Sequence, residues 1–202
     1  MDLSRPYADV LTGARGRVVA ALVQAGTGAT IRELAARAGT SPQGTLDVVT
    51  DLAESGIVDT DRVGRSVVVT LNHEHLAVPS LTELVALRLR LVERLTSHLA
   101  DWPPILDAAW LFGSAARGDG GRDSDIDILL VASRPDDPRW DHHTDELRHV
   151  VERWTGNRAQ LVEYDQDAFA RLVASDAPLV VSLRADAIAL TPAARRRLRR
   201  AS

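Results

Sequence analysis

The chain has 202 residues, of which 45% are apolar and 26% are charged. This balance is ordinary for a globular protein and excludes a disordered or fibrous chain. The formal net charge of -4 argues against a protein that coats nucleic acid nonspecifically, because such binding rests on basic groups that neutralise phosphates. The lack of cysteine excludes disulfides, thiolate zinc sites and thiol nucleophiles.

The sequence also bounds location and domain number. Residues 1–6 lack the apolar core of a signal peptide, and no apolar run approaches the roughly 20 residues that span a bilayer. We therefore expect a cytoplasmic protein without a membrane partner. The length allows two small domains, and the patterns described below predict them at 1–77 and 103–202, joined by a connecting helix at 78–102.

The first part of the chain has the pattern of three helices followed by a hairpin. Apolar spacing and capping residues predict helices over 14–25, 31–38 and 42–55. The second and third of these are short and are joined by a turn at 38–40, which is a helix-turn-helix signature. Strand-forming runs at 57–59 and 66–70 flank a turn, so they predict a wing.

The order and lengths of these elements resemble the winged helix-turn-helix of bacterial regulators such as the MarR and ArsR families, an all-α domain with a wing. The residues placed to meet double-stranded DNA are Ser41, Gln43, Thr45, Arg62 and Arg65. The third predicted helix also carries acidic residues, whose charge opposes DNA unless they face away. Protein contact or dimerisation through this domain is therefore the alternative.

A leucine stripe marks the connecting segment. Leucines at 84, 87, 91, 95 and 99 recur at steps of three and four, which predicts one long helix over 80–102. Such a stripe either packs against a neighbouring domain or pairs two copies of the chain. A homodimer through the connecting helix is the second of these alternatives.

Beyond residue 103, strands and helices alternate. The patterns predict strands over 105–112, 126–132, 158–164 and 187–190, and helices from 114, over 141–154 and over 165–175. This alternation indicates a compact α/β domain. The arginine-rich stretch at 195–200 is typical of a solvated helix end.

The turn at residues 113 and 114 has the features of a phosphate-binding turn. Gly113 directly follows an apolar strand and Ser114 opens a helix. Backbone N–H groups at such a turn face an anion, and glycine lets a phosphate approach closely. Arg117 and Arg122 lie close by in sequence and are candidates to meet phosphate oxygens.

Two acids follow at the start of the next predicted strand. Asp125 and Asp127 are two residues apart, and the period of a strand places both carboxylates on one face. Because like charges repel, this arrangement makes sense chiefly with a divalent cation beside them. The pair therefore predicts a metal site.

The segments 111–119 and 122–131 closely resemble the minimal nucleotidyltransferases of the DNA polymerase β superfamily, whose pattern is Gly-Ser, ten residues, then Asp-x-Asp. The resemblance implies an α+β nucleotidyltransferase fold with a mixed sheet, and two Mg²⁺ ions on the paired aspartates. It also implies that ATP or another NTP is bound by Gly113, Ser114, Arg117, Arg122 and Ser124. The implied reaction transfers a nucleoside monophosphate, AMP from ATP, to a hydroxyl. The acceptor lies on a partner protein, as in antitoxins that modify a paired toxin, or on a small molecule.

One position departs from the family pattern. Family members usually add a third carboxylate on a later strand, and here Gln160 stands at that place. An amide neither binds a metal as strongly nor accepts a proton. Glu163 is the remaining candidate for a third catalytic acid, although three residues further on it is expected to point to the opposite face.

This departure leaves three hypotheses open. The protein is a slow transferase, or a transcriptional regulator whose degenerate domain only senses nucleotide, or an antitoxin that acts by binding alone while repressing its own promoter.

Overall fold

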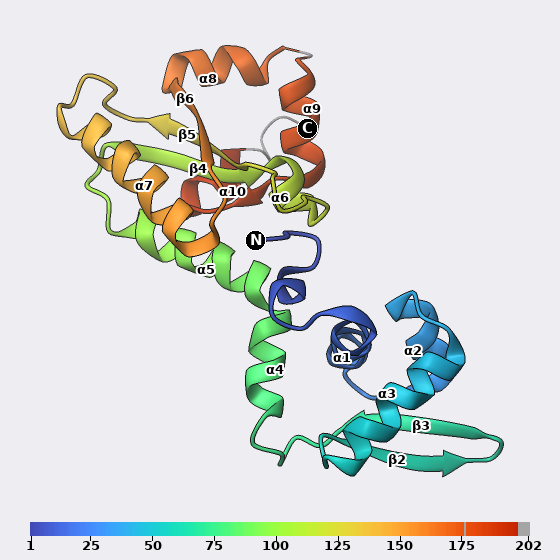
Figure 1. Cartoon of the computed structure of the whole chain (residues 1–202). Helices are drawn as coiled ribbons and strands as arrows, with labels where there is room; N and C mark the ends of the chain where they lie inside the picture. The colour runs from blue at the N-terminus through green and yellow to red at the C-terminus, as the bar shows by residue number, and fades with distance from the viewer. Residues whose placement is uncertain (176, 198–202) are drawn as a thin grey trace. The chain divides into compact units, whose positions relative to one another are not determined.

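The computed structural model describes residues 1–175 and 177–197, and the chain divides into two compact units (Figure 1). One unit is formed by Arg5–Leu87, and the other by Met1–Ser4 together with the chain from Arg88 onward. The chain therefore crosses between the units after Ser4 and again after Leu87. Residues 198–200 of the arginine-rich stretch lie outside the described residues.

The unit formed by Arg5–Leu87 has the fold of a winged helix. Its elements in chain order are η1 (Pro6–Asp9), α1 (Gly13–Ala25), β1 (Ala29–Thr30), α2 (Ile31–Ala38), α3 (Pro42–Glu54), β2 (Val58–Val63), β3 (Ser66–Leu71) and α4 (Val78–Val85). The three strands form an antiparallel sheet in the order β1-β3-β2. The predicted three helices and wing are confirmed. The strand β1 was not predicted, because two residues are too few to form a recognisable pattern.

Capping residues set the bounds of the helix-turn-helix. Thr30 and Glu33 form a reciprocal capping box at the start of α2, which satisfies backbone N–H groups that the helix leaves free. Gly39 ends α2 in the left-handed conformation, with a φ of +59°. Ser41 then caps α3, because its hydroxyl accepts a hydrogen bond from the Gly44 N–H at 3.0 Å.

Thr45 lies in the core of this unit, which corrects the prediction that it contacts DNA. Its side chain is 0% exposed. The hydroxyl donates to the Ser41 carbonyl at 3.0 Å and lies 2.7 Å from the Thr40 hydroxyl. Thr45 shares its helix face with Val49 and Leu52, which are also buried. Thr45 therefore stabilises the turn between α2 and α3, and its buried side chain does not reach a base.

The second unit contains a mixed four-stranded sheet. Its elements are α5 (Leu87–Ala100), β4 (Leu106–Phe112), α6 (Gly113–Arg117), β5 (Ile126–Ala132), α7 (Arg139–Thr155), β6 (Ala159–Asp165), α8 (Gln166–Val173), α9 (Pro178–Asp186), β7 (Ile188–Ala189) and α10 (Pro192–Arg197). The sheet order is β6-β5-β4-β7, with β5 and β6 parallel and the other pairs antiparallel. This confirms the predicted α/β fold class with a mixed sheet. Helix α9 was not predicted.

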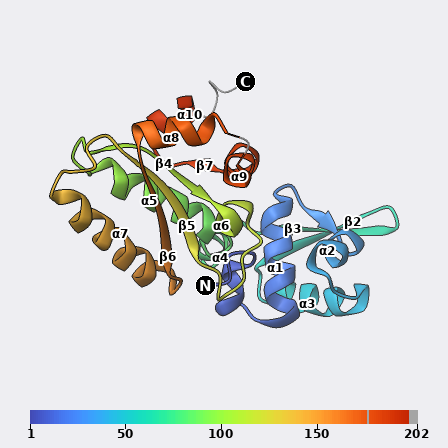
Figure 2. The same ribbon diagram turned by 90° about the horizontal axis from the view of Figure 1, so that it is seen from above.

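Helices cover both faces of this sheet (Figures 1 and 2). On one face, α5 and α7 contribute Leu95 and Leu147 to a core that includes Ile128. On the other face, α8 and α9 contribute Phe169 and Leu183 to a second core. Strand β5 faces both cores and is buried almost throughout, as its nearly continuous apolar run indicates. The carboxyl end of β4 and the amino end of β5 therefore meet at one fixed edge.

The stretch predicted as one connecting helix contains two helices. Helix α4 ends at Val85 and α5 begins at Leu87, with Ala86 between them outside either helix. Leu91, Leu95 and Leu99 of α5 are 5%, 0% and 3% exposed within the core of their own unit. This part of the stripe is therefore already covered and is not free to pair two copies of the chain.

We expect Thr45→Ala to destabilise the winged-helix unit by about 1–3 kcal/mol, because it removes a buried hydroxyl together with its hydrogen bonds to the Ser41 carbonyl and the Thr40 hydroxyl. Thr50→Ala is the matched control, since Thr50 is an exposed residue of the same helix whose hydroxyl bonds its own helix backbone. Thermal unfolding followed by circular dichroism measures the difference. Equal midpoints for the two variants would contradict the structural role of Thr45.

Candidate functional site

The site is built on contact between a glycine that directly follows strand β4 and an aspartate on the neighbouring strand β5. Phe112 pairs with Asp127, so Gly113 follows at the point where β4 turns into α6. Gly113 has a φ of +68°, a conformation that side chains rarely adopt. A Cβ atom at this position would collide with the Oδ2 atom of Asp127. Glycine is therefore required at position 113 for two reasons. The backbone has a positive φ, and the Asp127 carboxylate occupies the space where a side chain would lie.

The loop after α6 folds back over Ser114. The N–H groups of Gly118 and Asp119 donate to the Ser114 carbonyl at 2.8 and 3.2 Å. A Cβ atom on Gly120 would lie 2.8 Å from the Ser114 hydroxyl oxygen. The loop thus brings Gly120 against Ser114, which follows Gly113 in the turn that the sequence predicts to bind phosphate.

Asp125 and Asp127 lie close enough to interact electrostatically. Asp127 is partly buried and Asp125 is exposed. Burial raises the pKa of Asp127 above its ordinary value, the negative charge of Asp125 raises it further, and Arg117 acts in the opposite direction. A divalent cation would relieve this repulsion, which is the electrostatic character expected of a metal-binding pair.

The register of β6 separates Gln160 from Glu163. Gln160 pairs with Asp127 in the parallel ladder and therefore shares its face, whereas Glu163 pairs with Leu130 on the opposite face. The Glu163 carboxylate accepts hydrogen bonds from the Trp140 indole at 2.7 Å and from Arg148 at 2.8 Å. The structure therefore does not bring Glu163, the candidate third acid, to the two aspartates. Within residues 1–175 and 177–197, no three His, Asp or Glu side chains gather as a metal site.

Arg117 is surrounded by acids at the end of α6. Its Nε atom donates to Asp119 at 2.9 Å. This hydrogen bond is the main reason that the pKa of Arg117 is raised, and the charges of Asp186 and Asp127 add to it. The Arg117 side chain is 40% exposed, so a phosphate can compete with these acids for its guanidinium. Arg122, by contrast, lies on the exposed part of the loop.

The segment just before Asp125 is held by Asn157, which the sequence analysis did not identify. Asn157 is 3% exposed. Its amide nitrogen donates to the carbonyls of Arg122 and Ser124, both at 2.9 Å. Ser124 therefore contributes its backbone to the shape of the loop. Asp186 and Asn157 are far from the motif in sequence, so no local pattern could have marked them.

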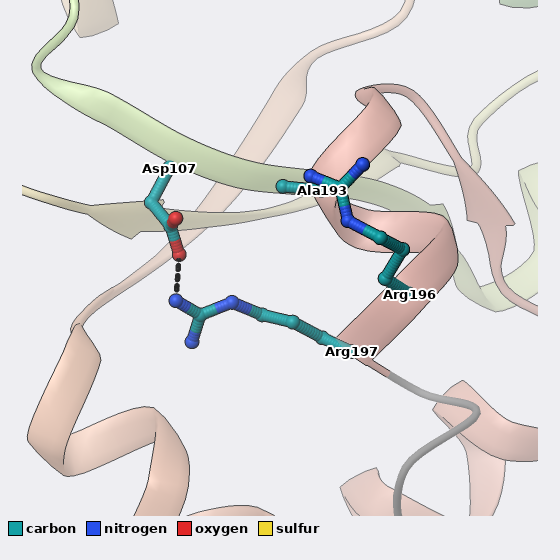
Figure 3. A pocket seen from close by; sticks show the side chains of 4 residues that line it. All are labelled: Asp107, Ala193, Arg196 and Arg197. Carbon is teal, nitrogen blue, oxygen red and sulfur yellow. Dashed lines mark ion pairs between the residues drawn. The ribbon is translucent and has the colours of Figure 1, made fainter.

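A cavity of about 220 Å³ lies elsewhere in this unit and is lined by Asp107, Ala193, Arg196 and Arg197 (Figure 3). Arg197 points toward Asp107 and forms an ion pair with it. Asp107 stands near the beginning of β4, whereas Gly113 follows its end. The cavity is therefore separated from the paired aspartates by almost the full length of the strand, and it is not part of the candidate site.

The remaining residues predicted to meet DNA are exposed. Arg62 lies near the end of β2 and Arg65 in the turn that follows, and both are exposed on the wing. Ser41 is exposed but its hydroxyl caps α3, and the Gln43 amide donates to Asp47 at 2.8 Å. Contact of Ser41 and Gln43 with bases would compete with these hydrogen bonds.

Comparisons with known proteins identify the second unit. Residues 92–177 match the family model for a nucleotidyltransferase domain, and they form a domain of this kind. No curated protein sequence matches the chain.

Within the part of the chain that the structure describes, no helix has the length and apolar character needed to span a membrane.

Some solved structures are similar to parts of the chain. The antimony-specific transcriptional repressor AntR is 26% identical, over 45% of this chain and 78% of its own, with a TM-score of 0.34. A toxin–antitoxin structure with AMP-PNP is 23% identical, over 50% and 72%, with a TM-score of 0.35. A variant of the toxin–antitoxin MntA–HpeT is 19% identical, over 55% and 79%, with a TM-score of 0.36.

We expect Gly113→Ala to weaken Mg²⁺-dependent ATP binding by at least tenfold, because the added methyl group displaces Asp127 and strains the backbone. Gly121→Ala is the matched control in the same loop region, since a Cβ atom there meets no atom within 4 Å. Titration calorimetry with ATP and Mg²⁺ compares the two variants. If Gly113→Ala binds ATP as the wild type does, the site is not built on this contact.

Proposed function

We propose that the C-terminal unit transfers a nucleoside monophosphate, AMP from ATP, to a hydroxyl acceptor. The observation that carries this proposal is the packing of the Asp127 carboxylate on Gly113, with Asp125 nearby. This contact brings the turn at Gly113 next to the two acids, as a site for a nucleotide with its divalent cation requires. The match of residues 92–177 to a nucleotidyltransferase domain supports the same chemistry.

Asp125 and Asp127 are the residues that would hold Mg²⁺. Their mutual repulsion and the partial burial of Asp127 fit a site for a divalent cation. When bound, two such cations would neutralise phosphate charge around the reacting α-phosphate. The backbone at Gly113 and Ser114, together with Arg117, would bind the β- and γ-phosphates, with Arg122 at the outer side of the loop.

The proposed reaction is a displacement at phosphorus. The oxygen of the acceptor hydroxyl attacks the α-phosphorus, the bond from this phosphorus to the bridging oxygen of the β-phosphate breaks, and pyrophosphate leaves with the electron pair. The hydroxyl proton passes to solvent. Gln160 has no basic atom to accept it, and Glu163 is held on the opposite face by Arg148. Neither of these two residues of β6 therefore serves as a general base in the proposed reaction.

The acceptor that we propose is a hydroxyl group on a partner protein. Asp125 and Arg122 are exposed, so the outer side of the site lies at the surface of the domain. A side chain of another folded protein can reach such a site, whereas a small molecule needs a pocket to bury it. A toxin-like protein paired with this chain is the form of partner that we propose.

We expect Gln160→Asp to speed transfer by about 10²–10⁴-fold, the usual contribution of a general base. Label transfer from [α-³²P]ATP with Mg²⁺ to proteins of the source cells measures the rate. Asp127→Asn should abolish transfer, and Glu163→Gln should leave it unchanged because Glu163 faces away. If Glu163→Gln abolishes transfer while Gln160→Asp changes nothing, Glu163 is the third catalytic acid and the roles inferred from the register of β6 are wrong.

A second candidate function is a nucleotide-sensing transcriptional regulator. The observation that favours it is Gln160 on the face of Asp127, where an acid would complete the catalytic site. In this alternative the nucleotide binds without reacting, and the winged helix contacts DNA through Ser41, Gln43 and the wing.

For the winged helix, we expect replacing Arg62 and Arg65 together with alanine to lower DNA affinity and to flatten its salt dependence. The logarithmic slope should fall by about one unit per lost phosphate contact. Binding of genomic fragments at several salt concentrations measures the slope. A wild-type protein that binds no fragment at low salt would restrict the winged helix to protein contacts.

A further inference from the structure

The winged-helix unit is inserted between the two parts of the other unit, Met1–Ser4 and the chain from Arg88 onward, which is called the nucleotidyltransferase unit below. Its chain enters after Ser4 and leaves after Leu87. Within the winged-helix unit, η1 follows the entry and α4 precedes the exit, and these two elements contact each other and α1. Both ends of the inserted unit are therefore gathered at one place in its own fold.

The residues just before the first crossing, Leu3 and Ser4, contact the loop of the proposed nucleotide site at Gly120. Leu3 is 1% exposed and belongs to the core of the nucleotidyltransferase unit. The Ser4 N–H donates to the Gly120 carbonyl at 2.9 Å. A Cβ atom on Gly120 would lie 3.0 Å from Leu3 and 2.8 Å from the Ser114 hydroxyl. Gly120 is thus packed between the crossing and the phosphate-binding turn.

The second crossing ends on helix α6. The Arg88 guanidinium donates from Nη1 to the Ala116 carbonyl at 2.8 Å. A Cβ atom on Gly118 would lie 2.9 Å from the same nitrogen, so Arg88 also covers the turn that ends α6. Arg88 is the first residue of the nucleotidyltransferase unit after the insertion. This crossing is therefore fixed to the helix that begins at Gly113.

The first crossing also reaches the segment before the paired aspartates. The Met1 nitrogen donates to the Asn157 side-chain oxygen at 2.8 Å. The same side chain holds the carbonyls of Arg122 and Ser124. The segment 113–125 is therefore contacted at residues 116, 118 and 120 by the crossings themselves, and at 122 and 124 through Asn157.

We propose that nucleotide binding and the winged-helix unit regulate each other through these two crossings, with Arg88 and Leu3 as the positioning residues. The inference rests on the proposed nucleotide site. Because linkage is reciprocal, a nucleotide that orders the segment 113–125 changes the winged-helix unit, and a macromolecule bound to that unit changes nucleotide affinity by the same factor. Such couplings are typically about 5–150-fold.

Hydrogen–deuterium exchange of the full chain tests the coupling, with Mg²⁺ and α,β-methylene-ATP as the probe. We expect slower exchange at 113–127 when the probe binds, together with a change at 5–10 and 78–87. In Arg88→Met the change at 5–10 and 78–87 should be lost and probe affinity should fall several-fold. Arg88→Lys keeps a donor for the Ala116 carbonyl and should restore both readouts.

Two further variants make the test specific. Leu3→Ala should lose the remote change as Arg88→Met does. Arg90→Met is the control, because Arg90 is an exposed arginine of the same helix that pairs with Glu93 at 2.6 Å. If the probe protects 113–127 alone in the wild type, the coupling is refuted and the nucleotide site stands. If the wild type binds no probe at all, the proposed function fails and the coupling fails with it.

Discussion

The contact of the Asp127 carboxylate with Gly113 is the constraint on which the rest of the site depends. It joins the end of β4 to the start of β5 at the place where a chain turn and two acids meet. Because Gly113 has a positive φ, the turn leads directly from the strand into α6. Any side chain at 113 would displace the acid, so the backbone conformation and the electrostatics of the site are set together.

The segment between this turn and Asp125 has little regular structure beyond the short helix α6. Loops of this kind keep their shape when other parts of the protein satisfy their backbone groups. Here Arg88, Ser4 and Asn157 donate to carbonyls of the segment from outside it. The geometry of the site therefore depends on residues that are distant in sequence. Two of them, Ser4 and Arg88, are the residues on either side of the inserted unit.

Features that depend on residues close together in sequence were predicted, and features that depend on residues far apart in sequence were missed. Helix caps, strand periodicity and the spacing of Asp125 and Asp127 are local signals, and they predicted most elements and the opposite orientation of Glu163. Thr45 was misassigned because its polar character was weighed above its spacing, although it falls on one helix face with Val49 and Leu52. Arg88 and Asn157 carry no local signal, because each acts on a carbonyl at least 28 residues away.

The interrupted layout of the nucleotidyltransferase unit also sets an order for its assembly during synthesis. Domains generally fold as units while the chain emerges from the ribosome, and the N-terminal ones fold first. The winged helix can thus complete its own core while Leu3 still lacks the strands and helices that bury it. The buried residues that share the core with Leu3 all lie beyond Arg88, so this side chain can be buried there only after they have been made.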